Sequence, residues 1–137
     1  MIYPRGFRAW HTYQKMILAG TLLAAYAPAA SAQELSKLPY VPTPQVVVDE
    51  MLKLAGVTAD DFVIDLGSGD GRIVITAAKR LKAKGLGVDI DGKLVALSNR
   101  NARAEKVEDR AEFVERDMFK TEISKASVLT LYVLPDF

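Results

Sequence analysis

The sequence contains no cysteine and only one histidine among its 137 residues. Without cysteine, disulfide bonds and cysteine-ligated zinc are excluded. The single histidine, His11, lies in a segment that we interpret below as a targeting sequence. This argues against a Ser-His-Asp triad and against a histidine-based metal site, and we expect no bound metal. The formal net charge is only +1, and no basic stripe is interleaved with aromatic residues, so nucleic acid is not an expected partner.

The first 32 residues contain no acidic side chain and three basic ones. Within this segment, residues 16–32 form a run of apolar and small residues that ends in Ala-Ser-Ala, the pattern of a signal peptidase site. An ordinary first helix is disfavoured because the run has no polar face. We predict that residues 1–32 are a signal peptide cleaved after Ala32 or an uncleaved membrane anchor, with an organelle presequence as the alternative. The protein would then be membrane-associated or exported.

Residues 33–42 are predicted to be a linker, and 43–137 alternate helical and strand patterns. Thr43-Pro44 is predicted to cap a first helix that ends at Gly56. The apolar stripe of that helix is predicted to contain Val46, Val47, Met51, Leu54 and Ala55. Further helices are predicted at 72–83 and 93–105, the second with Asp91 as N-cap, and strands at 62–66, 85–90, 111–116 and 127–134.

This order predicts an α/β fold with a parallel sheet that carries helices on both faces. The strand at 62–66 should be central, and ligands should bind beyond the carboxyl ends of the strands. One such end carries the segment DLGSGDGR at 65–72.

The glycines of this segment, Gly67, Gly69 and Gly71, indicate a tight turn that brings backbone close to a ligand. No Gly-Lys-Ser/Thr follows, so a Walker A loop is excluded. A dinucleotide fingerprint would need glycine where Arg72 stands. Asp65, at the end of the preceding strand, would repel a diphosphate and attract a cation. The turn therefore favours a ligand that presents an ammonium and a carboxylate, and a strand–helix turn without ligand is the alternative.

Asp89 ends the second predicted strand, where a carboxylate can accept hydrogen bonds from both hydroxyls of an adenosine ribose. The same position would suit NAD, so Asp89 alone leaves an NAD-linked oxidoreductase open. Asp65 combined with the glycine spacing disfavours that alternative.

The segments VIDLGSGDGRIVI, GVDID and RDMF resemble the class I methyltransferases that depend on S-adenosyl-L-methionine (SAM). More narrowly, LPYVPTPQVVVDEMLKLAGV and TLYVLP resemble the seven-β-strand protein-lysine methyltransferases that include the ATP synthase c-subunit lysine N-methyltransferase. The resemblance covers about residues 38–135. It implies a Rossmann-like methyltransferase fold, SAM as cofactor, and methyl transfer by in-line displacement to a protein lysine, with a membrane protein as one candidate acceptor.

The resemblance also implies roles for individual residues. The methionine part of SAM would be surrounded by Asp65, Gly67, Ser68, Gly69 and Gly71. The ribose would be bound by Asp89 with Ile90, and the adenine would be bordered by Asp117 with Met118. The methyl-transfer end would be lined by Tyr40 and Thr43, and Tyr132 is the one candidate catalytic residue. Simpler roles stay open. Asp117 could cap a turn, Tyr40 and Tyr132 could be packing residues, and Asp70 is expected to stabilise the turn.

The sequence stops soon after the fourth predicted strand, whereas the fold of the resembled family has seven. We therefore expect strands 5–7 to be missing and the edge of 127–134 to be uncovered, which favours aggregation. Under this expectation, a non-catalytic SAM-binding remnant is the alternative to an active methyltransferase.

Overall fold

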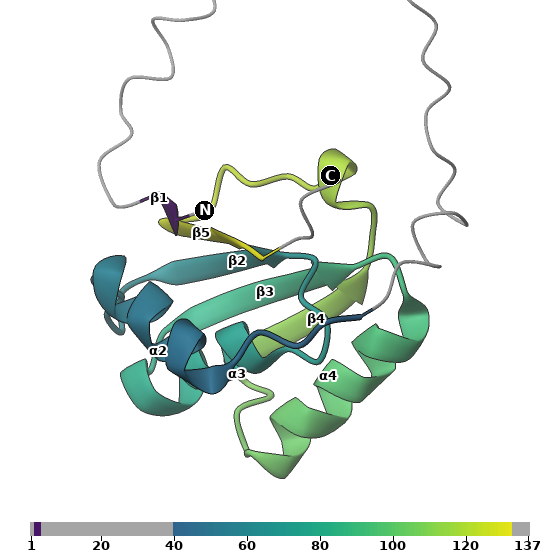
Figure 1. The fold of residues 1–137 in the computed structure, drawn as a ribbon, viewed down its shortest axis with the longest axis horizontal. Coiled ribbons are helices and arrows are strands. Elements are labelled where there is room, and N and C mark those ends of the chain that lie inside the picture. Colours follow the sequence, from purple (N-terminus) through teal and green to yellow (C-terminus); the bar gives the residue numbers. More distant parts are fainter. Residues whose placement is uncertain (1, 4–39, 133–137) are drawn as a thin grey trace, which may run out of the picture.

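A computed structural model describes residues 2–3 and 40–132 (Figure 1). The predictions for the segment 1–32 lie outside the described residues, apart from Ile2 and Tyr3. The helices are α2 (Gln45–Leu54), α3 (Arg72–Leu81), α4 (Gly92–Ala104) and the 3₁₀ helix η2 (Met118–Lys120). The strands are β1 (Ile2–Tyr3), β2 (Phe62–Leu66), β3 (Lys84–Asp89), β4 (Ala111–Glu115) and β5 (Val128–Leu131). None of the helices in this part of the chain is long and apolar enough to cross a membrane.

The strands form one sheet in the order β1-β5-β2-β3-β4. β2, β3, β4 and β5 are parallel, and β2 is central, which confirms the predicted α/β arrangement. The register places Asp65 of β2 between Gly87 of β3 and Thr130 of β5. Because the strands are parallel, their carboxyl ends and the connections that follow them lie at one edge of the sheet.

The strand β1 was not predicted. It pairs antiparallel with the outer edge of β5, with Ile2 opposite Thr130 and Tyr3 opposite Leu129. The edge that the sequence indicated as uncovered is therefore partly paired. The sequence could not predict β1, because a strand of two residues is too short to show the alternation of apolar and polar residues.

The three α-helices lie on one face of the sheet, as Figure 1 shows. On this face, α2 and α3 pack on Val63 and Val128, while α3 and α4 pack on Ala111 and Phe113. The opposite face is covered by the short helix η2 and the residues that follow it. Its apolar residues are Phe62, Ile64, Leu66, Leu86, Val88, Val114, Leu129 and Leu131. The sequence predicted α-helices on both faces of the sheet. In the described part of the chain this face carries none, because the connection from β4 to β5 forms only the 3₁₀ helix η2.

The start and the phase of α2 also differ from the prediction. Pro44 is the N-cap residue, and no side chain caps the helix, so Thr43 is not the cap. Val46 and Leu54 are 68% and 78% exposed. The buried positions are Val48, Met51, Leu52 and Ala55, which follow the i, i+3, i+4, i+7 spacing of a helix face. The run of three valines at 46–48 fits either phase, so packing against α3 decides between them.

The other two helices agree with the sequence pattern. α3 buries Ile73, Val74, Ala77 and Ala78 and exposes Lys79 and Arg80. The side chain of Asp91 accepts a hydrogen bond from the Lys93 N–H at 2.8 Å, which confirms it as the N-cap of α4. Both helices thus run away from the edge of the sheet at which the glycine turn lies.

Candidate functional site

The glycine turn, residues 67–71, connects β2 to α3 and is bound to the end of β3. The N–H groups of Gly67 and Ser68 both donate to the Val88 carbonyl, at 2.9 and 2.8 Å. The Gly69 N–H donates to Asp89 Oδ2 at 2.9 Å. The Gly71 N–H donates to the Ser68 carbonyl at 2.9 Å. A phosphate site at a helix N-terminus needs N–H groups that point at the ligand. Here the four N–H groups just described donate within the protein, which agrees with the argument against a diphosphate.

Asp65 lies below this turn and is only 1% exposed. Its Oδ1 accepts a hydrogen bond from the Thr130 hydroxyl at 2.7 Å. The pKa of Asp65 is raised to about 7, mainly by burial; the bond from Thr130 opposes the rise, and the nearby carboxylates of Asp89 and Asp70 add to it. A carboxylate in this position gains most from a ligand that brings a positive charge.

Asp89 stands at the end of β3, as predicted, but it has a structural task that the sequence did not indicate. Its Oδ2 accepts from the Gly69 N–H and its Oδ1 from the Asp91 N–H, each at 2.9 Å. The side chain thus joins the turn to the start of α4. Each carboxylate oxygen can accept a second hydrogen bond, so both oxygens could still accept from a ligand. Ile90, the next residue, is half-buried.

Behind the turn, close packing leaves no room for side chains larger than glycine. A Cβ on Gly71 would lie 2.6 Å from Phe113 Cζ and 2.8 Å from Ser98 Cβ. Gly71 therefore allows the turn to pack closely against the core, and we expect its role at the site to be this packing. Ser68 is buried, and its Oγ has no hydrogen-bond partner among the described residues. A buried hydroxyl of this kind is costly, and a polar ligand group would satisfy it.

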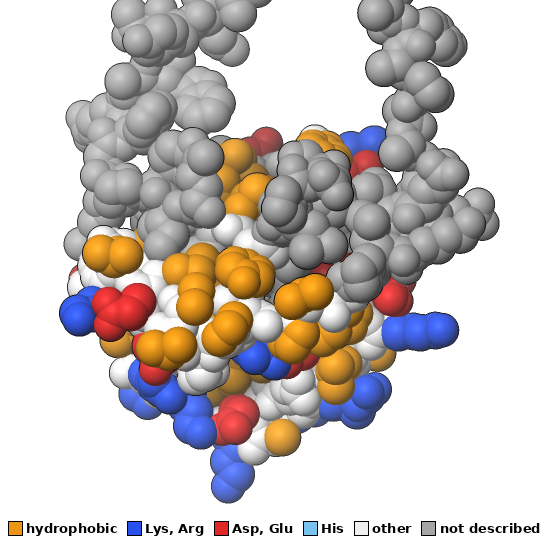
Figure 2. Space-filling view, in the orientation of Figure 1, with side chains coloured by type: hydrophobic (Ala, Val, Ile, Leu, Met, Phe, Trp, Pro, Cys, Tyr) orange, Lys and Arg blue, Asp and Glu red, His pale blue; other side chains and the backbone are white. Residues whose placement is uncertain are grey.

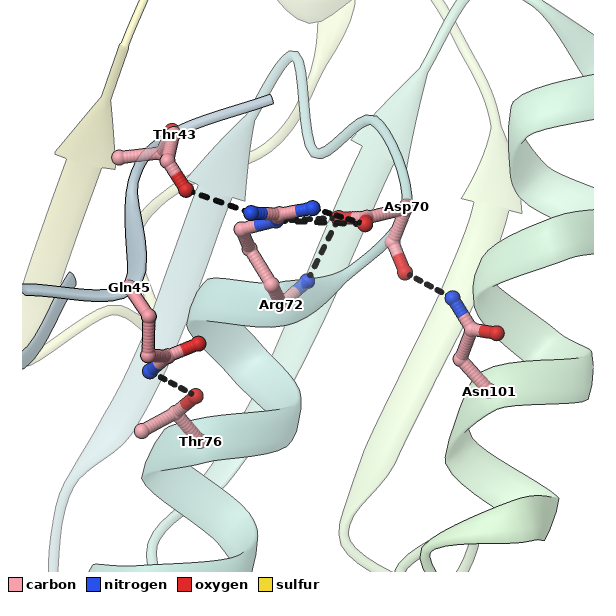
Figure 3. Close-up of polar contacts among 6 residues, drawn as sticks. All are labelled: Thr43, Gln45, Asp70, Arg72, Thr76 and Asn101. Atoms are coloured by element: carbon pink, nitrogen blue, oxygen red, sulfur yellow. Dashed lines mark hydrogen bonds and ion pairs between the residues drawn. The ribbon is translucent and has the colours of Figure 1, made fainter.

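Asp70 and Arg72 form an ion pair at the outer side of the turn (Figure 3). Arg72 Nε donates to Asp70 Oδ1 at 2.9 Å, and Nη2 donates to Asp70 Oδ2 at 2.6 Å. Burial alone would raise the pKa of Asp70, but hydrogen bonds from Arg72 and its charge hold that pKa below its usual value. From the other side, Asn101 Nδ2 of α4 donates to the Asp70 carbonyl at 2.9 Å. Asp70 stabilises the turn, as expected.

Residues 40–44, which we call the lead segment, pass over the turn before α2 begins. A Cβ on Gly69 would lie 2.5 Å from Cε2 of Tyr40, so the tyrosine ring lies directly against Gly69. Burial, followed by the charge of Asp70, raises the pKa of the Tyr40 hydroxyl. Thr43 is 6% exposed, and its carbonyl accepts a hydrogen bond from Arg72 Nη1 at 2.7 Å. The structure therefore brings Tyr40 and Thr43 to the glycine turn.

Tyr132 follows β5 directly and is 43% exposed, so it is not a core residue. Its neighbour Leu131 pairs with Leu66, which places Tyr132 at the same edge of the sheet as the turn. On the other side, the Arg116 N–H donates to the Asp89 carbonyl at 2.9 Å and brings the following residues beside β3.

Asp117 caps η2, because its Oδ1 accepts from the Phe119 N–H at 2.9 Å, in agreement with the simpler of its two expected roles. Met118 packs on the apolar cluster of Ile64, Leu66 and Val88. Both residues therefore have structural contacts of their own beside the end of β3, and their assignment to the adenine stays a prediction.

The chain has recognisable relatives among known proteins. The family model described as ANTKMT methyltransferase domain matches residues 65–137, more than half of the chain and the part that begins at Asp65. The chain belongs to this family.

Relatives of the ANTKMT methyltransferase domain agree with this. A protein-lysine N-methyltransferase of Saccharolobus islandicus is 45% identical over 71% of this chain and 61% of its own length. The ATP synthase c-subunit lysine N-methyltransferase of Xenopus laevis is 34% identical over 93% of this chain and 58% of its own. This chain spans about 60% of the length of these two curated relatives.

Among solved structures, an RNA methyltransferase from Salinibacter ruber in complex with S-adenosyl-L-homocysteine (SAH) is 52% identical. Its TM-score is 0.69, and the match covers 70% of this chain and 63% of that protein. A dimethyladenosine transferase from Plasmodium falciparum, at 22% identity and a TM-score of 0.61, supports the fold alone. The Rossmann-like methyltransferase fold predicted from the sequence is confirmed.

Three residues of this ANTKMT methyltransferase domain were missed at the sequence level. Thr130 is the polar residue within the apolar run of β5, and a polar residue in such a run could have indicated a buried hydrogen bond. Arg72 was noted only as the residue that replaces a glycine, although an acid two positions earlier indicated a local pair. Asn101 gave no signal, because a polar residue on a half-exposed helix is ordinary.

Proposed function

We propose that this chain binds SAM at the glycine turn and transfers its methyl group to a lysine of a protein. The observation that carries the proposal is the chemistry of the turn. Buried Asp65 lies beneath it, Asp89 lies beside it, and the N–H groups of all three glycines of the turn donate within the protein. Such a site favours a cationic ligand with hydroxyl groups over a diphosphate. Family membership and the SAH-bound relative support the same interpretation.

The described residues fit the parts of SAM. Asp65 would face the ammonium, whose charge would lower the pKa of this carboxyl and keep it ionised. The free lone pairs of Asp89 would accept hydrogen bonds from the ribose hydroxyls. The Ser68 hydroxyl, which has no partner among the described residues, would form a hydrogen bond with a polar group of the ligand. SAM supplies an activated methyl group for displacement by a nucleophile. The protein's own task is alignment, which can supply roughly 7–11 kcal/mol of a reaction barrier.

At the acceptor end, Tyr40 and Tyr132 present aromatic rings at the edge of the sheet that carries the turn. A lysine must lose its proton before it can act as a nucleophile, and an apolar mouth favours the neutral amine by desolvation. The two rings would position this amine. The proposal needs no dedicated catalytic base.

A protein lysine is favoured as acceptor because two curated relatives carry that name, one of them for a component of ATP synthase. The Salinibacter protein is named as an RNA methyltransferase instead. The net charge of +1 offers little attraction to a phosphate backbone, which is why RNA is the second candidate.

Isothermal titration calorimetry of the full chain with SAM, SAH and NAD tests the cofactor. We expect binding of SAM and SAH, no binding of NAD, and loss of SAM binding in Asp65→Asn. Asp109→Asn is the matched control, since this aspartate is 71% exposed and pairs with its neighbour Arg110. Binding of NAD in preference to SAM would refute the proposal.

Transfer is tested with methyl-labelled SAM and three acceptor pools from the cells that make the protein: membrane protein, soluble protein and total RNA. Acid hydrolysis of the labelled product should yield methyl-lysine, and we propose that the membrane fraction is the richer source. Label in RNA would move the acceptor to the second candidate. SAM binding without transfer to any pool would favour the non-catalytic alternative.

We also propose that the N-terminal segment directs the protein to a membrane. The basic residues and the apolar run at 16–32 support this. Cleavage after Ala32 would remove β1, whereas an uncleaved anchor would keep it. Fractionation with detection of the N-terminal and C-terminal ends of the chain distinguishes the two forms.

A further inference from the structure

The lead segment has no regular secondary structure, and its sequence limits how it can be held. Residues 42 and 44 are prolines, which have no N–H to donate. Its carbonyl groups are therefore the backbone groups best suited to fix it. The Thr43 carbonyl is bound by Arg72 at 2.7 Å, from the first turn of α3.

Arg72 makes this contact with one arm of a planar fork, and the other two nitrogens hold Asp70 (Figure 3). Asp70 is in turn fixed by Asn101 of α4. The guanidinium thus joins the lead segment to the glycine turn through a group that is itself anchored on two sides. A fork with fixed geometry can serve both partners, whereas the point charge of a lysine cannot.

The lead segment also carries the ring that lies on the turn. Tyr40 is in contact with Gly69, at the middle of the segment that the proposed cofactor must reach. Val41, the next residue, is 50% exposed, and Figure 2 shows hydrophobic side chains along the band where the lead segment and α2 lie. The close approach of Tyr40 to the turn therefore depends on two groups that Arg72 holds, the Thr43 carbonyl and Asp70, whose charge raises the pKa of the Tyr40 hydroxyl.

We propose that Arg72 is a positioning residue, which latches the lead segment over the glycine turn and so sets how firmly the cofactor is held. The effect on the cofactor rests on the proposed function. The latch itself rests only on the contacts of Arg72, Asp70 and Thr43.

The role is local, because α2 has other attachments to α3. Gln45 Nε2 donates to the Thr76 hydroxyl at 3.2 Å. Val48, Met51 and Leu52 pack in the core that α2 shares with α3. Arg80 pairs with Asp49 at 2.8 Å in an exposed position. Loss of Arg72 therefore releases residues 40–43, while α2 and its N-cap Pro44 stay packed.

The test uses the absence of cysteine in the chain. A nitroxide spin label on Val41→Cys reports the motion of the lead segment alone. Arg72→Gln removes the latch, and Arg72→Lys keeps the charge but not the fork. Arg80→Gln is the control, since it removes another arginine of α3, which pairs with Asp49 of α2 and makes no hydrogen bond with the described residues of the lead segment.

We expect the label to become mobile in Arg72→Gln, to become partly mobile in Arg72→Lys, and to stay unchanged in Arg80→Gln. Circular dichroism and cooperative thermal unfolding establish that each variant is folded, and Arg72→Lys decides the matter if Arg72→Gln does not fold. The dissociation constant for SAH should rise about tenfold or more in Arg72→Gln, the scale of one charge-assisted hydrogen bond, and less than about twofold in the control.

An immobile label in a folded Arg72→Gln variant would overturn the latch. A mobile label with unchanged SAH affinity would overturn its link to the cofactor. If the parent Val41→Cys chain binds neither SAM nor SAH, the proposed function fails, and the label still decides whether the latch exists.

Discussion

Replacing Asp65 by asparagine should make the protein more stable at neutral pH while removing its affinity for SAM. The carboxyl group is 1% exposed and has the Thr130 hydroxyl as its hydrogen-bond donor. Asparagine has nearly the same shape, and its Oδ1 can accept the same bond. It carries no charge to desolvate, and no charge to attract an ammonium.

The magnitude follows from the pKa of Asp65, which burial raises from 3.8 to about 7. Between these values the folded protein keeps a proton that the unfolded chain has lost, so stability falls as the pH rises. The contribution is fully present below about pH 4 and is lost as the pH passes about 7. At about 1.4 kcal/mol per unit, the whole loss is about 4 kcal/mol, of which roughly 3 kcal/mol falls between pH 5 and pH 8.

The asparagine amide group brings a cost of its own. Its N–H₂ donors would be buried without an assigned acceptor, at about 1–3 kcal/mol. This cost does not change with pH, so the pH dependence isolates the carboxylate.

Urea unfolding followed by circular dichroism at pH 5 and pH 8 measures the free energy of unfolding of both proteins. We expect the difference, variant minus wild type, to rise by roughly 3 kcal/mol from pH 5 to pH 8. Asp109→Asn controls for a general effect of removing an acid, because its carboxylate is exposed. A difference that stays constant within about 0.5 kcal/mol would mean that Asp65 is not desolvated in the folded protein, and the reasoning about its charge would fail.

Three further predictions concern the turn and the N-terminus. Asp89→Ala should weaken SAM binding at least about tenfold, and Asp89→Asn, which keeps one acceptor oxygen, should weaken it less; unchanged calorimetric affinity in a folded alanine variant would remove Asp89 from the site. Gly69→Val should abolish SAM binding, because the residue has a φ of +56° and its Cβ would meet the Tyr40 ring at 2.5 Å; normal binding by this variant would mean that the turn is structural only. Mass spectrometry of the expressed protein should find either Gln33 as the first residue or the intact chain in the membrane fraction, and an intact chain confined to the soluble cytosol would contradict both forms of that prediction.

The turn and the parallel strands were predictable because their signals are local. Apolar runs of strand length, glycines at fixed spacing and an acid at the end of a strand all lie within a few residues of one another. Asp91 as the cap of α4 is of the same kind.

The missed features depend on contacts between distant segments. The pairing of Thr130 with Asp65 follows from sheet register, and the bond from Arg72 to the Thr43 carbonyl spans two elements and leaves no periodicity. The prediction of the buried face of α2 failed for a different reason. Three consecutive valines are equally apolar, and only packing determines that Val48 is the buried one.

The position of Thr130 on the last described strand has a consequence for the order of assembly. The hydrogen bond between Gly69 and Asp89 closes a loop of 20 residues, whereas the bond between Thr130 and Asp65 closes one of 65. The longer closure costs about 1 kcal/mol more in chain entropy. In a chain emerging from the ribosome, the turn can therefore form before β5 has been synthesised, with Asp65 still hydrated and ionised. Docking of β5 then buries the carboxylate, and we expect this late step to take up a proton at neutral pH and to proceed faster in acid.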